Sequence, residues 1–241
     1  MIFGAASLPA MAHDSTYENT ILVQGRGQIK TNPDSLEVTA TIETQSKNAK
    51  MARLQNAEKA TAVINAIKAL NVAGLKVSTG WFNSSPQYKY DNGKNTIVGY
   101  QVNNNLNIKI EASSADLQTV ASDVVDAAIT NGATNVSNIR FYISDNNPVF
   151  DEALKLAVKQ AKRRAELMAS AAGVRVSGVY TMESYSQSSP EVSGAAPRMM
   201  VAKMSMDSAY AEPSTPILNE PMNVEASVTV RFDLQDTPPQ H

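Results

Sequence analysis

The sequence predicts an α+β fold, with antiparallel sheets and three main helices packed on them, split near residues 90–99 into two entwined subdomains. Three segments repeat apolar residues at spacings of three and four, which is typical of amphipathic helices. The segments between them alternate apolar and polar residues, which indicates strands with one buried face. A turn sequence, Asp91-Asn92-Gly93-Lys94, joins two long alternating segments and predicts a hairpin.

The first two strands precede the first helix. Ile21, Val23 and Gly25 open the first strand, and Pro33-Asp34 makes the turn that follows it. In the second strand the apolar residues occupy alternate positions: Leu36, Val38, Ala40 and Ile42.

The first helix is expected over residues 47–71, with Gly74 just past its end. Its predicted apolar stripe consists of Leu54, Ala57, Ala60, Ile64 and Ile67. The hairpin strands follow over residues 77–90 and 96–111. The second of these has an apolar face and a polar face, the polar one formed by Gln101, Asn103, Asn105, Asn107, Lys109 and Glu111.

Two further helices are predicted. The one over 115–131 has Ser113 and Asp116 at capping-box spacing and Gly132 as its stop, and its stripe is Leu117, Val120, Val124 and Ala128. The one over 148–172 starts with Asn147 as a cap and Pro148 in the first turn. Its predicted stripe, rich in small residues, is Leu154, Ala157, Ala161, Ala165, Met168 and Ala172.

The remaining strands are expected at 139–143, 179–185 and 224–232. Residues 186–221 form an irregular excursion with five prolines, and residues 235–241 form a tail. We expect an N-terminal subdomain over 13–95 and a C-terminal subdomain over 96–234. Residues 1–12 end in Ala10-Met11-Ala12, which predicts the remnant of a secretory signal and hence export to the periplasm.

Composition narrows the chemistry available to the chain. The 241 residues include no cysteine, and the two histidines, His13 and His241, lie at the chain ends. A thiol nucleophile is therefore excluded, and a catalytic triad or a His-ligated metal site would need a terminus. We predict no enzyme activity, with an acid-only or Ser/Lys site as the alternative. A net charge of −2 gives no general attraction to nucleic acid, and no segment is apolar enough for a transmembrane helix.

Three local patterns were compared with functional motifs. Gly25-Arg26-Gly27 lacks the third glycine and the helix of a dinucleotide-binding motif, so it indicates close backbone approach or a bulge. Asp145-Asn146-Asn147 is better explained as a helix cap than as a calcium loop. The basic side of the third helix favours a solvated face over an anion-binding surface, and comprises Lys155, Lys159, Lys162, Arg163 and Arg164.

One eight-residue stretch inside the excursion contains four methionines: Met199, Met200, Met204 and Met206. Thioethers can bind Cu(I), and they also react with oxidants. Apolar packing or assembly is the preferred interpretation, so these residues are only weak metal candidates and no cofactor is predicted.

Aromatic residues concentrate on the hairpin, where they indicate packing or a subunit interface. We expect a homo-oligomer, because an exposed apolar excursion would promote association of a chain that has little net charge. The candidate assembly residues are Trp81, Tyr88, Tyr90, Met199 and Met200.

The ordered combination of these segments resembles the SIMPL-domain family. The resemblance rests on Val23-x-Gly25-x-Gly27, on the hairpin segments 78–90 and 97–102, and on the helical pattern over 154–174. It covers residues 20–234 and is to the bacterial periplasmic members known as oxidative-stress-defence or periplasmic immunogenic proteins. It implies two small α/β-sandwich subdomains, no established activity or cofactor, and homo-oligomers, ring-like ones included.

The residue patterns and the family resemblance together predict a non-enzymatic exported envelope protein that self-assembles and contributes to oxidative and envelope stress tolerance. Association with the envelope would be peripheral. The alternatives are a periplasmic copper-binding or methionine-based oxidant-scavenging protein, and an enzyme with an unrecognised site free of His and Cys.

Overall fold

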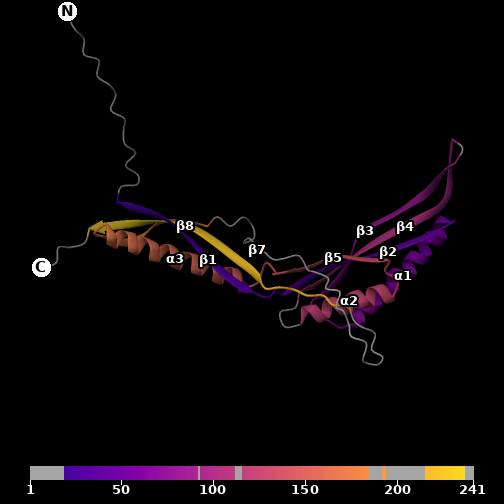
Figure 1. Ribbon diagram of the computed structural model, residues 1–241, viewed down its shortest axis with the longest axis horizontal. Coiled ribbons are helices and arrows are strands. Elements are labelled where there is room, and N and C mark those ends of the chain that lie inside the picture. Colours follow the sequence, from indigo (N-terminus) through magenta and orange to yellow (C-terminus); the bar gives the residue numbers. More distant parts are fainter. Residues whose placement is uncertain (1–18, 92, 112–115, 185–191, 194–214, 237–241) are drawn as a thin grey trace, which may run out of the picture. The chain divides into compact units, whose positions relative to one another are not determined.

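The computed structural model confirms the α+β prediction. It describes residues 19–91, 93–111, 116–184, 192–193 and 215–236, which form helices and two antiparallel sheets (Figure 1). The elements are β1 (Thr20–Thr31), β2 (Ser35–Ser46), α1 (Ala49–Ala69), β3 (Leu75–Asp91), β4 (Lys94–Glu111), α2 (Leu117–Thr130), β5 (Asn135–Tyr142), α3 (Val149–Ala171), β6 (Val174–Ser184), β7 (Val192–Ser193) and β8 (Met222–Asp236).

The chain divides into two compact units. Unit 1 contains residues 1–29, 148–191 and 225–241, and unit 2 contains residues 30–147 and 192–224. The boundary expected from the sequence, at residues 95–96, lies within β4, close to the turn of the β3–β4 hairpin. The two strands of that hairpin pair along their whole length, so both belong to unit 2.

Unit 2 is a sheet of order β3-β4-β2-β5 with α1 and α2 packed on one face (Figure 1). The core lies between the sheet and these helices, because the strands direct alternate apolar side chains to that face. Its fully buried large side chains include Leu36, Val38, Ile42, Val63, Ile67, Leu106, Ile108, Ile110 and Val124.

The buried stripe of α1 is shifted from the predicted one. Leu54 is 40% exposed, and Ala57 is exposed as well. The shift follows from Asn56, which is buried and donates from Nδ2 to the carbonyl oxygens of Ile42 at 2.9 Å and Val102 at 3.3 Å. A polar residue therefore occupies the core side of the helix. The buried positions are Ala52, Asn56, Ala60, Val63 and Ile67.

Unit 1 packs α3 against a sheet of order β1-β8-β6. The short strand β7 pairs with Asn223 and Val224 at the start of β8, residues that belong to unit 2. An added Cβ on Gly25 would lie 2.0 Å from the carbonyl oxygen of Ala157, and one on Gly27 would lie 1.9 Å from that of Ala153. These glycines thus permit close approach of β1 and α3, as the sequence predicted.

The buried face of α3 is formed at i+4 spacing by Val149, Ala153, Ala157, Ala161, Ala165 and Ala169. Three of the predicted alanines are correct, but Leu154, Met168 and Ala172 are exposed. Small side chains line this face because the glycine-bearing strand leaves no room for larger ones.

The predicted helix caps are partly wrong. The N-cap of α3 is Pro148, which makes no side-chain cap, while Asn147 donates to Asp34 Oδ2 at 2.6 Å. Asp116 is itself the N-cap of α2, since its carboxylate accepts from Gln118 N. Ser113 lies outside the described residues, as do 1–12, His13, His241 and the four methionines of the excursion.

Candidate interaction surfaces of the β3–β4 hairpin

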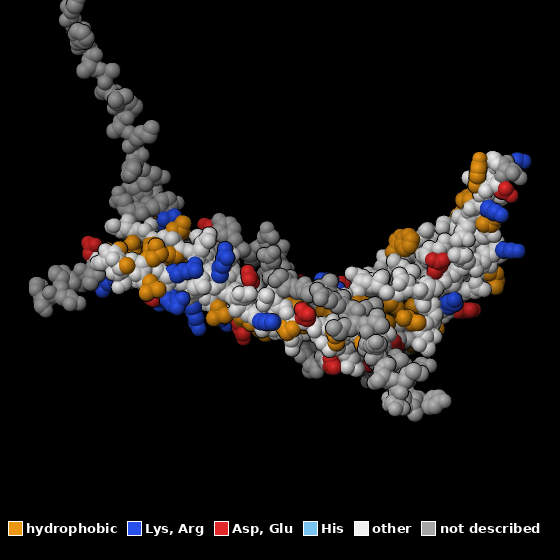
Figure 2. Space-filling view, viewed as in Figure 1, with side chains coloured by type: hydrophobic (Ala, Val, Ile, Leu, Met, Phe, Trp, Pro, Cys, Tyr) orange, Lys and Arg blue, Asp and Glu red, His pale blue; other side chains and the backbone are white. Residues whose placement is uncertain are grey.

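The distal end of the β3–β4 hairpin carries exposed apolar side chains. Tyr88 is 59% exposed, Tyr90 73%, Ile97 52% and Val98 48%, and we call these four residues the hairpin tip. β2 pairs with β4 only as far as Tyr100, so the distal part of β4 pairs with β3 alone. The hairpin extends past the other strands in Figure 1, and hydrophobic side chains lie among charged ones at its end in Figure 2.

Trp81 lies on a different surface of the same hairpin. The β3–β4 register shifts between Thr79 and Trp81, so Gly80 is an extra residue in a bulge. Thr79 pairs with the core residue Leu106, whereas Trp81 pairs with Asn105, whose side chain points away from the core. The bulge therefore turns Trp81 to the face opposite the helices, where it is 52% exposed.

Gly80 also makes room for a polar neighbour. A Cβ at this position would lie 2.6 Å from Asn107 Nδ2. The amide of Asn107 consequently lies against the backbone of β3, beside the position of Trp81.

The face that carries Trp81 is rich in amides and hydroxyls. We call it the outer face, defined as the side of the unit 2 sheet opposite α1 and α2. The register aligns three rows across it. They contain Thr39, Asn107 and Ser78, then Thr41, Asn105 and Trp81, then Glu43, Asn103 and Asn83.

Amides also interact along this face toward the tip. Gln87 Nε2 donates to Gln101 Oε1 at 2.9 Å, and Gln45 Nε2 donates to Glu43 Oε1 at 2.8 Å. By contrast, Asn105 Oδ1 has no hydrogen-bond partner among the described residues, although it is shielded from solvent. An oxygen of this kind could accept a hydrogen bond from outside the chain only after its side chain moves.

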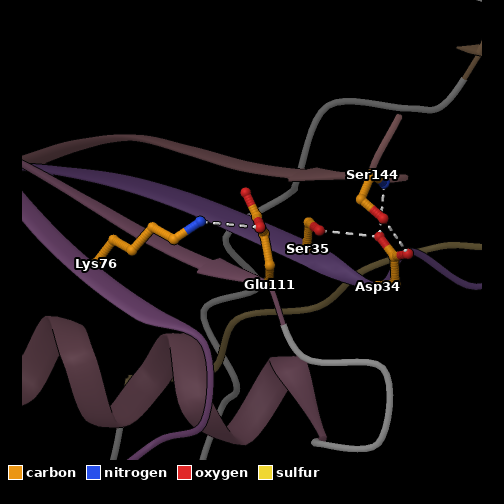
Figure 3. Close-up of polar contacts among 5 residues, drawn as sticks. All are labelled: Asp34, Ser35, Lys76, Glu111 and Ser144. Atoms are coloured by element: carbon orange, nitrogen blue, oxygen red, sulfur yellow. Dashed lines mark hydrogen bonds and ion pairs between the residues drawn. The ribbon is translucent and has the colours of Figure 1, made fainter. Parts of the chain in front are cut away.

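Apart from Glu43, the charged residues of the aligned β2, β4 and β5 positions on the outer face lie at the end of the sheet away from the tip. Glu37 accepts from Arg140 at 2.6 Å and lies 3.7 Å from Lys109 Nζ. The hydrogen bond from Arg140, and then the positive charge of Lys109, hold the pKa of Glu37 below its usual value against the effect of burial. Lys76 and Glu111 pair at 3.2 Å (Figure 3). These charges therefore largely neutralise one another.

The helix face with the basic side chains is partly engaged within unit 1. Arg164 donates to the carbonyl oxygen of Gln24 at 2.8 Å, and Lys162 lies 3.9 Å from Glu166. Figure 2 shows Lys and Arg side chains over α3. The contacts of Arg164 agree with a structural role for part of this face.

The described part of the chain contains no group of three or more His, Asp or Glu side chains placed to hold a metal ion. Within the same residues, none of the helices combines the length and the hydrophobicity needed to cross a bilayer. Within the described residues of unit 2, the hairpin tip and the outer face are the surfaces considered below as candidate interaction sites.

The structure separates the predicted assembly residues. Tyr88 and Tyr90 lie at the tip, whereas Trp81 lies about 23 Å along β3 from Tyr88. Met199 and Met200, with Met204 and Met206, lie outside the described residues. The sequence analysis did not include Ile97 and Val98 among the assembly candidates, since apolar β-branched residues in strands are usually buried.

Comparison with known proteins gives a consistent picture. A family model described as "SIMPL: Protein of unknown function (DUF541)" matches residues 21–232. A Brucella melitensis protein named "26 kDa periplasmic immunogenic protein" is 29% identical, covering 98% of this chain and 94% of its own. The Escherichia coli protein named "Uncharacterized protein YggE" is 21% identical, covering 97% and 91%. A solved structure, "The crystal structure of AtUAH in complex with glyoxylate", covers 56% of this chain and 34% of its own at a TM-score of 0.27, too low to support a conclusion.

Proposed function

This chain belongs to the SIMPL (DUF541) family, and we propose that it is a non-enzymatic exported envelope protein that self-associates through the hairpin tip. In that form it contributes to tolerance of oxidative and envelope stress. Export to the periplasm is supported by the Ala10-Met11-Ala12 pattern and by the name of the Brucella relatives.

The exposure of the hairpin tip is the observation that carries self-association. Burying one large apolar side chain contributes about 1.5–3 kcal/mol, so four of them brought together can offset much of the cost of association. Isolated exposed apolar residues are ordinary on protein surfaces, but a contiguous group at the end of a projecting hairpin marks an interaction site.

A second copy of the chain is the proposed partner because the charges at the tip are self-complementary. Asp91 lies opposite Lys94 in the backbone register of the two strands, and Lys89 lies two residues before Asp91 on β3. Two tips related by a two-fold axis can therefore place Asp91 of each near a lysine of the other. The segment 186–221 is proposed to add contacts.

The role in stress tolerance is tested in cells. A deletion strain is complemented with the wild-type chain, with a tip variant (Tyr88→Thr, Tyr90→Thr, Ile97→Thr) or with a control variant. The control, Ile129→Ser, removes an apolar side chain that is 53% exposed on α2. We expect wild type and control to restore survival under peroxide and envelope stress and the tip variant to fail.

Expression and periplasmic fractionation are checked for every variant. If the deletion strain survives peroxide, heat and envelope stress as well as its parent, the proposed role is wrong. If the tip variant complements fully, self-association through the tip is not needed for that role.

A further inference from the structure

We propose that the outer face of the unit 2 sheet binds an uncharged glycan chain that carries hydroxyl and acetamido groups, with Trp81 as the stacking platform. The inference rests on the outer face alone and is independent of self-association through the tip.

The position of Trp81 is the first step. Trp81 keeps about half of its surface in water, because a bulge at Gly80 turns it to the face of the sheet that none of the described helices covers. Without the extra residue, the alternation of the strand would direct Trp81 to the helix-covered face. An exposed indole ring on a rigid strand is suited to stacking against the C–H face of a sugar ring.

The side chains around Trp81 are the second step. The neighbouring positions on β4 and β2 supply amides and hydroxyls, which both donate and accept hydrogen bonds as sugar hydroxyl and acetamido groups do. Asn105, paired with Trp81, has an Oδ1 atom without a donor among the described residues. Asn105 as a residue is only partly buried, and the proposal requires its side chain to rotate so that this oxygen meets a hydroxyl of the ligand. The outward-facing positions along β4, from Gln101 to Asn107, span about 20 Å. A ligand that covers them is a chain rather than a single sugar.

Charge complementarity is the third step, because it determines the class of ligand. The row of Trp81 and the adjoining row that contains Thr39, Asn107 and Ser78 have no ionisable side chain, while the adjoining row toward the tip contains the acidic Glu43. Three cations at the far end of the sheet share two carboxylates, Arg140 and Lys109 with Glu37 and Lys76 with Glu111, and none of them lies in a row next to Trp81. A nucleic acid or an acidic polysaccharide needs cations to bind, and the described residues in the rows next to the indole provide none. A neutral glycan does not need them.

The test uses the fact that Trp81 is the only tryptophan of the chain. Its fluorescence therefore reports on the outer face alone. We expect the β-1,4-linked hexamer of N-acetylglucosamine to shift the emission to shorter wavelength in a saturable way. Asn105→Ala should weaken binding by about fivefold, the equivalent of one hydrogen bond. The matched control is Gln55→Ala, an exposed amide on α1, which should bind like wild type.

Calorimetry extends the test to Trp81→Ala, which should weaken binding by about tenfold or more while leaving the circular dichroism unchanged. Two results would overturn the proposal: no fluorescence change and no heat with the hexamer up to about 10 mM, or equal binding of an anionic heparin hexasaccharide. A fall in the mass of the assembly on Trp81→Ala, without any effect on the sugar, would instead assign the outer face to contact between copies and would also overturn it.

Discussion

The carboxylate of Asp34 accepts two hydrogen bonds from Ser144, one from the backbone N–H at 2.7 Å and one from the hydroxyl at 2.6 Å (Figure 3). Ser35 Oγ and Asn147 Nδ2 donate to the same carboxylate. These bonds tie the turn before β2 to the segment after β5. The sequence analysis assigned Asp34 to a turn, and its role as a shared acceptor emerges only from the fold.

Replacing Asp34 with alanine should lower the free energy of unfolding by about 1–3 kcal/mol, because the Ser144 and Asn147 donors lose their acceptor. Urea unfolding monitored by circular dichroism measures this loss. Ser137→Ala, on the exposed part of β5, is a control that should change stability little.

The stabilisation by Asp34 should depend on pH. Burial alone would raise the pKa of Asp34, but the hydrogen bonds from Ser144, Asn147 and Ser35 hold it below the usual 3.8. A depressed folded-state pKa gives stability that is present above the unfolded value and lost as pH falls through the folded value. Wild type should therefore lose more stability than Asp34→Asn as pH is lowered from about 5 to about 2. Parallel losses in the two proteins would contradict this account.

Gly27→Ala should destabilise unit 1 strongly. The new Cβ would lie 1.9 Å from the carbonyl oxygen of Ala153 and 2.7 Å from the backbone nitrogen of Ala157, so β1 and α3 must move apart. We expect a loss of about 3 kcal/mol or more in urea unfolding. Gln28→Ala, at the next and exposed position of β1, is the control. Equal stability of the two variants would show that the close packing is not required.

Asn56→Ala should cost about 1–3 kcal/mol, because the carbonyl oxygens of Ile42 and Val102 lose the Nδ2 donor in a buried place. The adjacent Gln55→Ala variant should be nearly neutral, since that side chain is exposed. Thermal unfolding compares the two, and a neutral effect of Asn56→Ala would contradict the assigned role.

The β1 edge should be protected by two side chains of α3. Gln160 Oε1 accepts from the backbone N–H of Arg26 at 2.8 Å, and Arg164 donates to the carbonyl oxygen of Gln24 at 2.8 Å. These contacts occupy strand groups that another strand could otherwise bind. We expect the double variant Gln160→Ala/Arg164→Ala to aggregate faster than wild type in light-scattering time courses below the unfolding temperature. Lys155→Ala/Lys159→Ala, which removes charge from the same helix, controls for solubility.

Local signals in the sequence predicted the helices, the hairpin and the close approach of Gly25 and Gly27. They succeeded because apolar periodicity and turn residues act over a few positions. The buried faces of α1 and α3 were partly wrong, since a buried Asn56 and a strict alanine stripe depend on the surface that each helix meets. A prediction based on large apolar residues selects Leu54 and Met168 for the buried faces, rather than Asn56 on α1 and the alanines on α3.

The candidate surfaces could be predicted only in part. Aromatic enrichment identified Trp81, Tyr88 and Tyr90, but it placed them on one surface. Trp81 and Tyr88 are seven residues apart with no extra β3 residue between them, so the alternation of the strand places them on opposite faces. The bulge at Gly80 decides which face Trp81 occupies, and it results from the register between β3 and β4 rather than from the sequence of β3 alone. The periodicity of β4 did predict its amide-lined outer face, because alternation is a local property.

Self-association through the hairpin tip is tested most directly by the mass of the full chain in multi-angle light scattering at micromolar concentration. The account predicts a multiple of 25.9 kDa for wild type and for Ile129→Ser. It predicts a mass near 25.9 kDa for the Tyr88→Thr/Tyr90→Thr/Ile97→Thr variant, with circular dichroism like that of wild type. A wild-type mass near 25.9 kDa, or an assembly that the tip substitutions leave intact, would contradict it.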